Sequence, residues 1–273
     1  MASKLKRQLN EWLFSRTGDQ FCSYFNAVNK VYWKLPIAVE WDSVREKIVV
    51  TDGRDRIFIA RPKRVRRYKH GIGAKLDILA NEYLLGHIDF RDGDTIVDCG
   101  ANVGEVGTWL TRANASLDVI SIEPEALEAE CCDLNVYGGE EKTIRKALWH
   151  EEGELTFYLK NDSGDSSVFE TTHYDFTRTV PTTTLSSLLD ERSVSTLKLL
   201  KLEAEGAEPE ILAGAEDCLD RIEYIAADLG PERGINDDTT AAAAINLLLS
   251  RNFQVVDVRS GRLVCLFRNQ KFL

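Results

Sequence analysis

The 273-residue sequence lacks several features that would place it in a specialised class of protein. It has no run of about 18 apolar residues that could span a bilayer, and no charged and then apolar leader with a cleavage site. Its six cysteines form no C-x-x-C pair and have no histidines at metal-binding spacing, so neither a disulfide framework nor a zinc site is predicted. We therefore expect a cytoplasmic protein without a transmembrane segment.

Charge is unevenly distributed along the chain. Residues 1–76 contain 17 Lys and Arg against 7 Asp and Glu, whereas the remainder contains 17 against 37. The length and the apolar content of 44% are those of an ordinary globular protein, with room for one α/β domain and an extension. We predict an N-terminal helical and β accessory region, 1–90, and a larger domain, 91–273.

The accessory region has three readable segments. Residues 1–15 have the spacing of an amphipathic basic helix, which either lies on a membrane or packs against its own domain or a partner. Residues 47–60 predict a hairpin with its turn at Asp52-Gly53. The basic segment 61–69 either binds an anionic substrate or nucleic acid, or is a solvated face that offsets the acidic domain.

The stretch 94–107, DTIVDCGANVGEVG, has the pattern of a nucleotide-binding loop. A short apolar run ends in Asp98, and three glycines follow where a strand must turn into a helix: Gly100, Gly104 and Gly107. Glycine allows close backbone approach to a ligand, and the helix N-terminus offers N–H groups. The next apolar run ends in Glu123-Pro124, where a carboxylate can accept hydrogen bonds from both ribose hydroxyls. Together they predict an adenosine-containing cofactor, although an ordinary turn between a strand and a helix is the alternative.

The loop lacks the second glycine of a dinucleotide motif. G-x-G-x-x-G clears room for a pyrophosphate, but Asn102 occupies the corresponding position here. S-adenosylmethionine carries no phosphate, and its sulfonium and ammonium cations suit an acid such as Asp98. The sequence therefore favours S-adenosylmethionine over a nicotinamide dinucleotide.

Strand and helix patterns alternate from residue 94 onward, which predicts a largely parallel sheet with helices on both faces. The predicted strands are 95–98, 119–122, 143–148, 197–202, 222–227, 253–258 and 263–267. The connection at Ser260-Gly261 is too short for a crossover helix, so the last strand must run antiparallel. Seven strands with an antiparallel last strand are typical of a Rossmann-like methyltransferase.

Ligands of such sheets bind beyond the carboxyl ends of the strands, and several chemically useful residues follow these ends. Strand alternation places Lys201, Glu203 and Glu205 on one side of their segment. Burying ionisable residues at a strand end costs free energy, so their presence there indicates a functional role. Asp228 is a further acid in this region, and Lys146-Ala147 lies at the end of the third predicted strand.

The order and spacing of motifs over residues 93–228 resemble the FkbM family of S-adenosylmethionine-dependent methyltransferases. The strings that carry the resemblance are DCGANVGE, IEP, the following Asn135, KALW with Gly153, Ser166-Ser167, PTTTL at 181–185 and LKLLKLEAEGAEPEIL at 197–212. The resemblance implies O-methylation of a hydroxyl on a sugar or polyketide-type product, usually in bacterial polysaccharide or natural-product pathways. Two positions depart from the family, which usually has Asp at Glu203 and at Ser186.

These observations give one hypothesis for the site. The methionine part is held by Asp98, Gly100, Ala101, Asn102 and Gly104, the ribose by Glu123 and Pro124, and the adenine by Lys146 and Ala147, with Ser167 touching or closing over the cofactor. The acceptor hydroxyl is oriented or deprotonated by Glu203 or Glu205, with Asp228 as a further candidate. Alternatives are a helix-start role for Glu205, a base at His150 or His173, and Mg²⁺ held by the three acids. We assign no metal site.

The leading interpretation is an enzyme that methylates a small-molecule or glycan acceptor, and the basic segment leaves an anionic acceptor open as an alternative. The alternative is a non-catalytic subunit with the same fold that binds a partner in a glycan-assembly complex through its basic N-terminal region. An NAD-dependent enzyme is disfavoured by Asn102 and by the final antiparallel strand. We expect no nucleic-acid partner, and a homo-oligomer is compatible with the sequence.

Overall fold

The computed structural model describes residues 2–114, 116–160 and 166–273, with side chains from residue 8 in the first helix. It forms two compact units, Met1–Asp77 and Ile78–Leu273, which are described separately. The helix α3 (Ile72–Glu82) contains the division between them. No helix among the described residues is long and apolar enough to cross a membrane.

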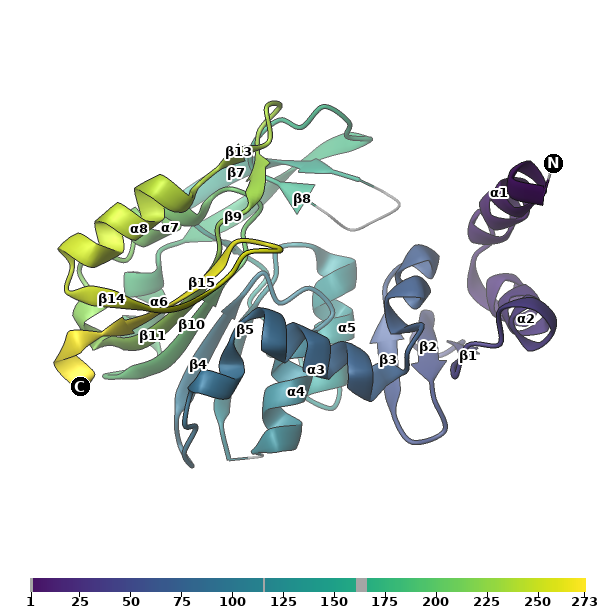
Figure 1. The fold of residues 1–273 in the computed structure, drawn as a ribbon, viewed down its shortest axis with the longest axis horizontal. Coiled ribbons are helices and arrows are strands. Elements are labelled where there is room, and N and C mark those ends of the chain that lie inside the picture. The colour runs from purple at the N-terminus through teal and green to yellow at the C-terminus, as the bar shows by residue number, and fades with distance from the viewer. Residues whose placement is uncertain (1, 115, 161–165) are drawn as a thin grey trace. The chain divides into compact units, whose positions relative to one another are not determined.

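The first unit contains two helices and a small antiparallel sheet in the order β1-β2-β3 (Figure 1). Its elements are α1 (Ala2–Phe14), α2 (Gly18–Val28), a π-helical turn (Asn29–Trp33), β1 (Ala38–Asp42), β2 (Lys47–Thr51), β3 (Arg56–Ile59) and a 3-10 helix (Pro62–Tyr68). The predicted first helix and the predicted hairpin are confirmed. The strand β1 was missed because it is short and only Val39 in it is fully buried.

The basic segment 61–69 packs partly into its own unit. Arg61 and Arg64 are buried, and the Arg66 guanidinium lies 4.1 Å from the centroid of the Phe14 ring. Burial lowers the pKa of Arg66. The arginines of this segment therefore contribute to packing as well as to surface charge.

The second unit is built on a six-stranded sheet in the order β14-β15-β11-β10-β4-β5. Its strands are β4 (Thr95–Cys99), β5 (Asp118–Ile122), β10 (Leu197–Leu202), β11 (Ile222–Asp228), β14 (Phe253–Arg259) and β15 (Val264–Asn269). β5, β4, β10 and β11 are parallel, whereas β15 is antiparallel to both of its neighbours. The predicted α/β Rossmann-like class with an antiparallel last strand is confirmed.

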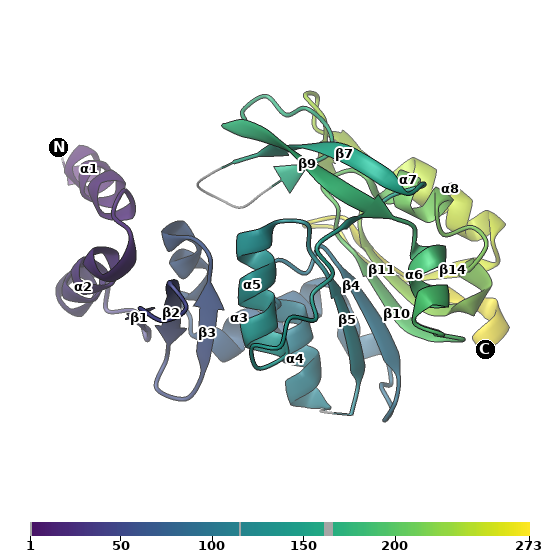
Figure 2. The same cartoon turned by 180° about the vertical axis from the view of Figure 1, so that it is seen from behind.

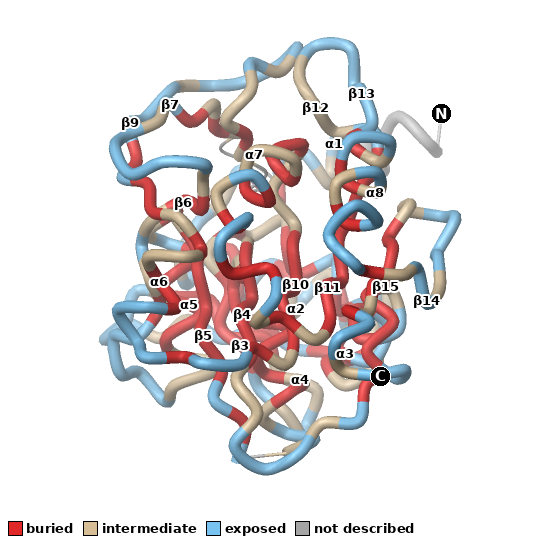
Figure 3. The backbone as a smooth tube through the Cα atoms, turned by 90° about the vertical axis from the view of Figure 1, so that its left-hand side faces the viewer, coloured by how far each residue is buried: buried red, intermediate tan, exposed pale blue. Residues whose placement is uncertain are grey.

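Helices cover both faces of this sheet because its central strands carry apolar side chains on both sides. On one face, Val97, Leu200 and Ile225 pack with residues of α6 (Leu185–Glu191), α7 (Glu208–Ala213) and α8 (Ala241–Ser250). On the other face, Ile96 and Leu199 pack with residues 79–88 and with α4 (Glu105–Ala113), which contacts α5 (Ala126–Val136). Figure 3 shows these central strands as buried backbone.

A second, smaller sheet in the order β6-β9-β7-β8 was not predicted. Its strands are β6 (Ala147–Leu148), β7 (Gly153–Leu159), β8 (Ser166–Ser167) and β9 (Phe176–Thr183). Half of the residues of β9 are exposed and its buried positions do not alternate regularly with them, so its sequence lacks the apolar alternation of a half-buried strand. Figures 1 and 2 show this sheet at one end of the large one.

The third predicted strand, 143–148, differs in extent from the expectation. It reaches the large sheet at a single parallel bridge, between Ile122 and Ile144. The polar pair Arg145-Lys146 interrupts the apolar run, and Ala147–Leu148 then pairs with β9 in the smaller sheet. The large sheet accordingly has six strands and this bridge at its edge.

Candidate active site

A buried ion pair joins the carboxyl ends of β4 and β10. Lys201 lies opposite Asp98 in the strand register, and its Nζ is 3.1 Å from Asp98 Oδ1. The same Nζ donates to the backbone oxygens of Cys99 and Gly100, at 3.0 and 2.8 Å. Burial would lower the pKa of Lys201, but the carboxylates of Asp98 and Glu203 raise it above its ordinary value. Asp98 is thus fully buried and paired with a cation of the protein itself.

Glu203 lies one residue beyond β10 and is held by three side chains. The Tyr83 hydroxyl donates to its Oε2, Arg262 Nη2 donates to its Oε1 at 2.6 Å, and Lys201 Nζ is 3.3 Å from Oε2. Burial raises the pKa of Glu203, yet the Lys201 and Arg262 charges and these hydrogen bonds lower it to about 2. Glu203 is therefore a stable carboxylate and a weak base.

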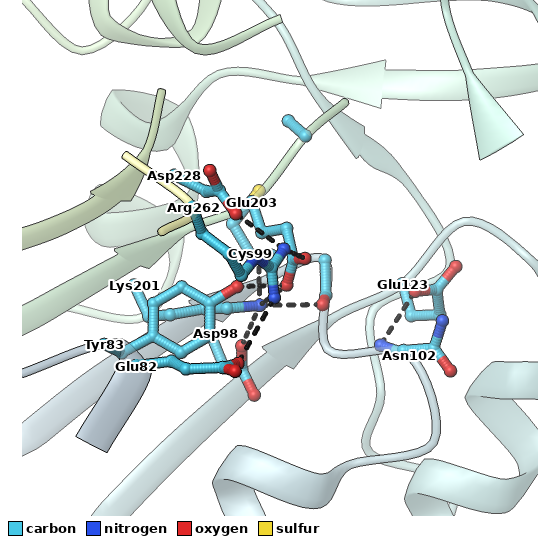
Figure 4. Close-up of polar contacts among 12 residues, drawn as sticks. Glu82, Tyr83, Asp98, Cys99, Asn102, Glu123, Lys201, Glu203, Asp228 and Arg262 are labelled. Carbon is cyan, nitrogen blue, oxygen red and sulfur yellow. Dashed lines mark hydrogen bonds and ion pairs between the residues drawn. The ribbon is translucent and has the colours of Figure 1, made fainter. Parts of the chain in front are cut away.

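Asp228 completes this charged cluster at the end of β11. Its Oδ2 is 2.6 Å from Arg262 Nη2, and its Oδ1 accepts the Gly230 N–H at 3.1 Å. Burial raises the pKa of Asp228 although Arg262 opposes the shift. Figure 4 shows Arg262 between Asp228 and Glu203, with Tyr83 alongside. The site thus brings together two of the three predicted catalytic acids.

Sequence reasoning missed Tyr83 and Arg262. The apolar spacing of residues 76–85 predicts a helix with Tyr83 on its inner face but gives Tyr83 no chemical role, and Tyr83 is fully buried. Its ring also lies under the Lys201 ammonium, 5.1 Å from the centroid. Arg262 follows the short connection Ser260-Gly261 that the strand pattern had identified. One feature of the sequence could have identified Arg262: it follows the connection that reverses the chain at the carboxyl end of β11, where ligands of such sheets bind.

The glycine-rich loop after β4 has the left-handed conformations that its sequence suggests. The φ angles are +72° at Gly100, +51° at Asn102 and +82° at Gly104. A Cβ at Gly100 would collide with the backbone oxygen of Glu203, so glycine lets this loop pass the end of β10. Asn102 Oδ1 accepts the Val103 N–H at 2.9 Å, which supports the turn.

Glu123 joins this loop to the end of β5. Its Oε2 accepts the Asn102 N–H at 2.8 Å, and its Oε1 accepts the Glu125 N–H at 2.9 Å. Burial raises the pKa of Glu123 to about 7 although both hydrogen bonds oppose the shift. Each carboxylate oxygen has two lone pairs, so each retains capacity for one more donor. Figure 4 shows Glu123 and Asn102 apart from the charged cluster.

The remaining predicted cofactor residues lie in different surroundings. Ala101 is buried and its N–H donates to Ile122 O at 3.0 Å, and Pro124 follows Glu123 directly. Ala147 packs in the apolar cluster of the smaller sheet, and Lys146 beside it is half-buried.

Ser167 and Glu205 meet between the smaller sheet and the loop after β10. Ser167 Oγ donates to the Glu205 backbone oxygen at 3.1 Å and accepts the Phe169 N–H at the same distance. The acid at the start of α7 is Glu208, whose Oε1 accepts the Ala204 and Gly206 N–H groups. The expected helix-start role thus belongs to Glu208. His150 and His173 are exposed.

The acids of the cluster face cations of the protein. Within residues 2–114, 116–160 and 166–273, no group of three or more His, Cys, Asp or Glu side chains is arranged to hold a metal ion. Glu203 and Asp228 converge on Arg262 instead.

The parallel sheet with its antiparallel last strand defines a Rossmann-like fold of the methyltransferase class. The family model described as "Methyltransferase FkbM domain" matches residues 98–255. The chain belongs to this family, and it is an S-adenosylmethionine-dependent methyltransferase.

Individual relatives are distant. The chain is similar to the 2-O-methyltransferase NoeI of Sinorhizobium fredii (strain NBRC 101917 / NGR234), at 19% identity over 72% of this chain and 88% of NoeI. Among solved structures, methyltransferase FkbM from Methylobacillus flagellatus KT matches with a TM-score of 0.49 and 15% identity, over 76% of this chain and 53% of that one. The N-terminal domain of human METTL16 in complex with SAH matches with a TM-score of 0.40 and 13% identity, over 92% of this chain and 82% of that one. The chain thus spans about half the length of the Methylobacillus protein.

Proposed function

We propose that this methyltransferase transfers the methyl group to a hydroxyl of a sugar or natural-product acceptor. The observation that carries the proposal is the charged cluster of Glu203, Asp228, Arg262 and Tyr83 at the carboxyl ends of β10 and β11, next to the glycine-rich loop. Such a cluster offers fixed acceptors and donors for a polyhydroxylated molecule. The name of the relative NoeI, a 2-O-methyltransferase, supports transfer to oxygen.

The same geometry supports a proposal for the cofactor-binding residues. The Glu123 carboxylate would accept the ribose hydroxyls with the lone pairs left by the Asn102 and Glu125 N–H groups. The left-handed loop at Gly100, Asn102 and Gly104 would hold the methionine part of the cofactor. Asp98 would contribute indirectly, because its carboxylate is paired with the Lys201 ammonium. The bound cofactor supplies a methyl group on a sulfonium, which an oxygen nucleophile attacks in line. The protein's part is alignment of the acceptor and removal of its proton.

Calorimetry with 5′-methylthioadenosine tests the ribose assignment. This probe carries adenine and ribose but no amino or carboxyl group that would titrate. Because the pKa of Glu123 is about 7 and the ribose hydroxyls favour its charged form, binding should be about tenfold tighter at pH 8 than at pH 6. Glu123→Gln should weaken binding and remove the pH dependence, whereas the exposed control Glu140→Gln should change neither.

The nature of the product tests the acceptor class. Methyl transfer from labelled S-adenosylmethionine to a panel of methyl glycosides should give a base-stable methyl ether. A base-labile methyl ester or an N-methyl product would overturn the proposal of hydroxyl methylation. Cofactor binding without turnover on the whole panel would instead favour the non-catalytic subunit.

A further inference from the structure

Glu232 lies in the turn that follows Asp228, yet the charged cluster does not include it. Strand β12 (Pro231–Arg233) begins three residues after the end of β11 and pairs with β13 (Asp238–Thr239). The register shifts between Pro231 and Arg233, so Glu232 occupies a bulge without a ladder partner. Bulges recur next to active sites, where they redirect a side chain.

The backbone on both sides of Glu232 is fixed. Its N–H donates to Gly230 O at 3.0 Å, and the Gly230 N–H donates to Asp228 Oδ1 at 3.1 Å. On the other side, the Arg233 guanidinium forms two hydrogen bonds with Glu210, at 2.8 and 2.6 Å. It also lies over the Phe169 ring, 4.0 Å from the centroid. Glu232 is therefore presented from a rigid turn rather than from a free loop.

The neighbouring acids are already engaged. Glu203 and Asp228 are held by Arg262, and Glu210 by Arg233. Glu208 accepts two backbone N–H groups and the Thr240 hydroxyl. The Glu232 side chain, in contrast, makes no hydrogen bond and no ion pair within the described part of the chain, and it is half-buried.

The charges around Glu232 suit a base. Burial raises its pKa, and the charges of Asp228 and Glu203 raise it further. Glu208 adds to this effect, and Arg262 opposes it, with a resulting pKa of about 7. A general base is most effective when its pKa lies near the working pH, whereas the pKa of Glu203 is only about 2.

We propose that Glu232 is the proton acceptor for the hydroxyl that is methylated. This assignment rests on the proposed function and names the base that it requires. The hydroxyl oxygen forms a bond to the methyl carbon, the carbon–sulfur bond breaks with its electron pair passing to sulfur, and the hydroxyl proton passes to the Glu232 carboxylate. Glu203 and Asp228, fixed by Arg262, orient the acceptor.

The first test is a titration that needs no acceptor. The full chain, labelled with ¹³C at its glutamate carboxyls and saturated with S-adenosylhomocysteine, is titrated by NMR. Glu232→Gln should remove a resonance whose midpoint lies near pH 7, and Glu123→Gln identifies the resonance of Glu123 separately. Loss of a resonance with an ordinary midpoint near pH 4.5 on Glu232→Gln would overturn the assignment.

The second test is kinetic and uses the glycoside panel. Glu232→Gln should lower kcat by about 10²- to 10⁴-fold and flatten the fall of rate below pH 7, with the affinity for S-adenosylhomocysteine unchanged. Glu232→Asp should recover part of the rate, and the exposed control Glu191→Gln should keep all of it. A wild-type kcat in Glu232→Gln overturns the role of Glu232 alone, whereas absence of methyl ether with every variant counts against the proposed function.

Discussion

At the scale of single residues, the site depends on buried charges that neutralise one another. Asp98, Lys201 and Glu203 lie on the same face of the sheet as Ile96 and Leu199. At the carboxyl ends of β4 and β10, paired charges therefore take the place of the apolar side chains of the core. Alternation along 201–205 allowed the sequence to predict the shared side of Lys201 and Glu203. It did not predict their partners, because Tyr83 and Arg262 come from segments about 120 and 60 residues away.

Lys201→Met tests this neutralisation. The change leaves Asp98 without its cation in the interior and should cost about 3–5 kcal/mol of unfolding free energy at pH 7. The pKa of Glu203 is lowered to about 2, so the stability it contributes is present above its ordinary pKa of 4.5 and is lost as pH falls through 2. Part of the destabilisation should therefore disappear as the pH falls from 4.5 towards 2, measured by urea unfolding.

The control is Lys271→Met, which breaks an exposed pair with Asp220 at 3.0 Å. It should cost less than about 1 kcal/mol. Equal costs for the two variants would contradict a special role for the buried pair.

At the scale of elements, the glycine-rich loop was predicted for ligand approach, but its glycines also serve packing. A Cβ at Gly104 would lie 2.6 Å from Val136 Cγ2 and 3.0 Å from Cys132 Sγ, both on α5. One at Gly107 would lie 3.0 Å from Val136 Cγ2. The close contact of α4 with α5 could not be read from the loop sequence, since it depends on which helices become neighbours.

Gly104→Ala separates the two demands on this position. It should lower the free energy of unfolding by about 2–5 kcal/mol. Alanine in the left-handed conformation costs about 1–2 kcal/mol, and overpacking of its Cβ against α5 costs about 1–3 kcal/mol. Gly138→Ala is the matched control, because Gly138 has φ +65° and a Cβ there would meet nothing within 4 Å. It should show the backbone cost alone in chemical unfolding.

Val136→Ala should rescue part of the effect by removing the Cγ2 atom that the new Cβ meets. In the double variant with Gly104→Ala, the excess over the Gly138→Ala cost should shrink, measured as a coupling free energy. Purely additive costs would show that α5 does not constrain Gly104.

At the scale of the whole molecule, the sequence predicted the class of the large sheet and its antiparallel last strand. It did not predict the smaller sheet or the boundary between the two units. Long apolar strands are buried on both faces, so their pattern survives without structural context. The smaller sheet was missed because its strands are either two residues long or partly exposed. The contacts divide the chain between Asp77 and Ile78, next to the end of the basic region at residue 76, whereas the predicted domain boundary lies at residue 90.

The position of this boundary can be tested by truncation. A fragment 91–273 would lack Tyr83, which donates to Glu203, together with the buried Leu84 and Leu85 that pack under the large sheet. A fragment 71–273 keeps these residues and the whole of α3. We expect the longer fragment to melt cooperatively and to bind 5′-methylthioadenosine. The shorter fragment should lose several kcal/mol of stabilisation from buried apolar side chains. It also lacks the Tyr83 hydroxyl that donates to Glu203, so we expect it not to fold stably. Cooperative melting and binding by 91–273 would show that residues 78–90 are dispensable to the domain and that its core closes without Tyr83.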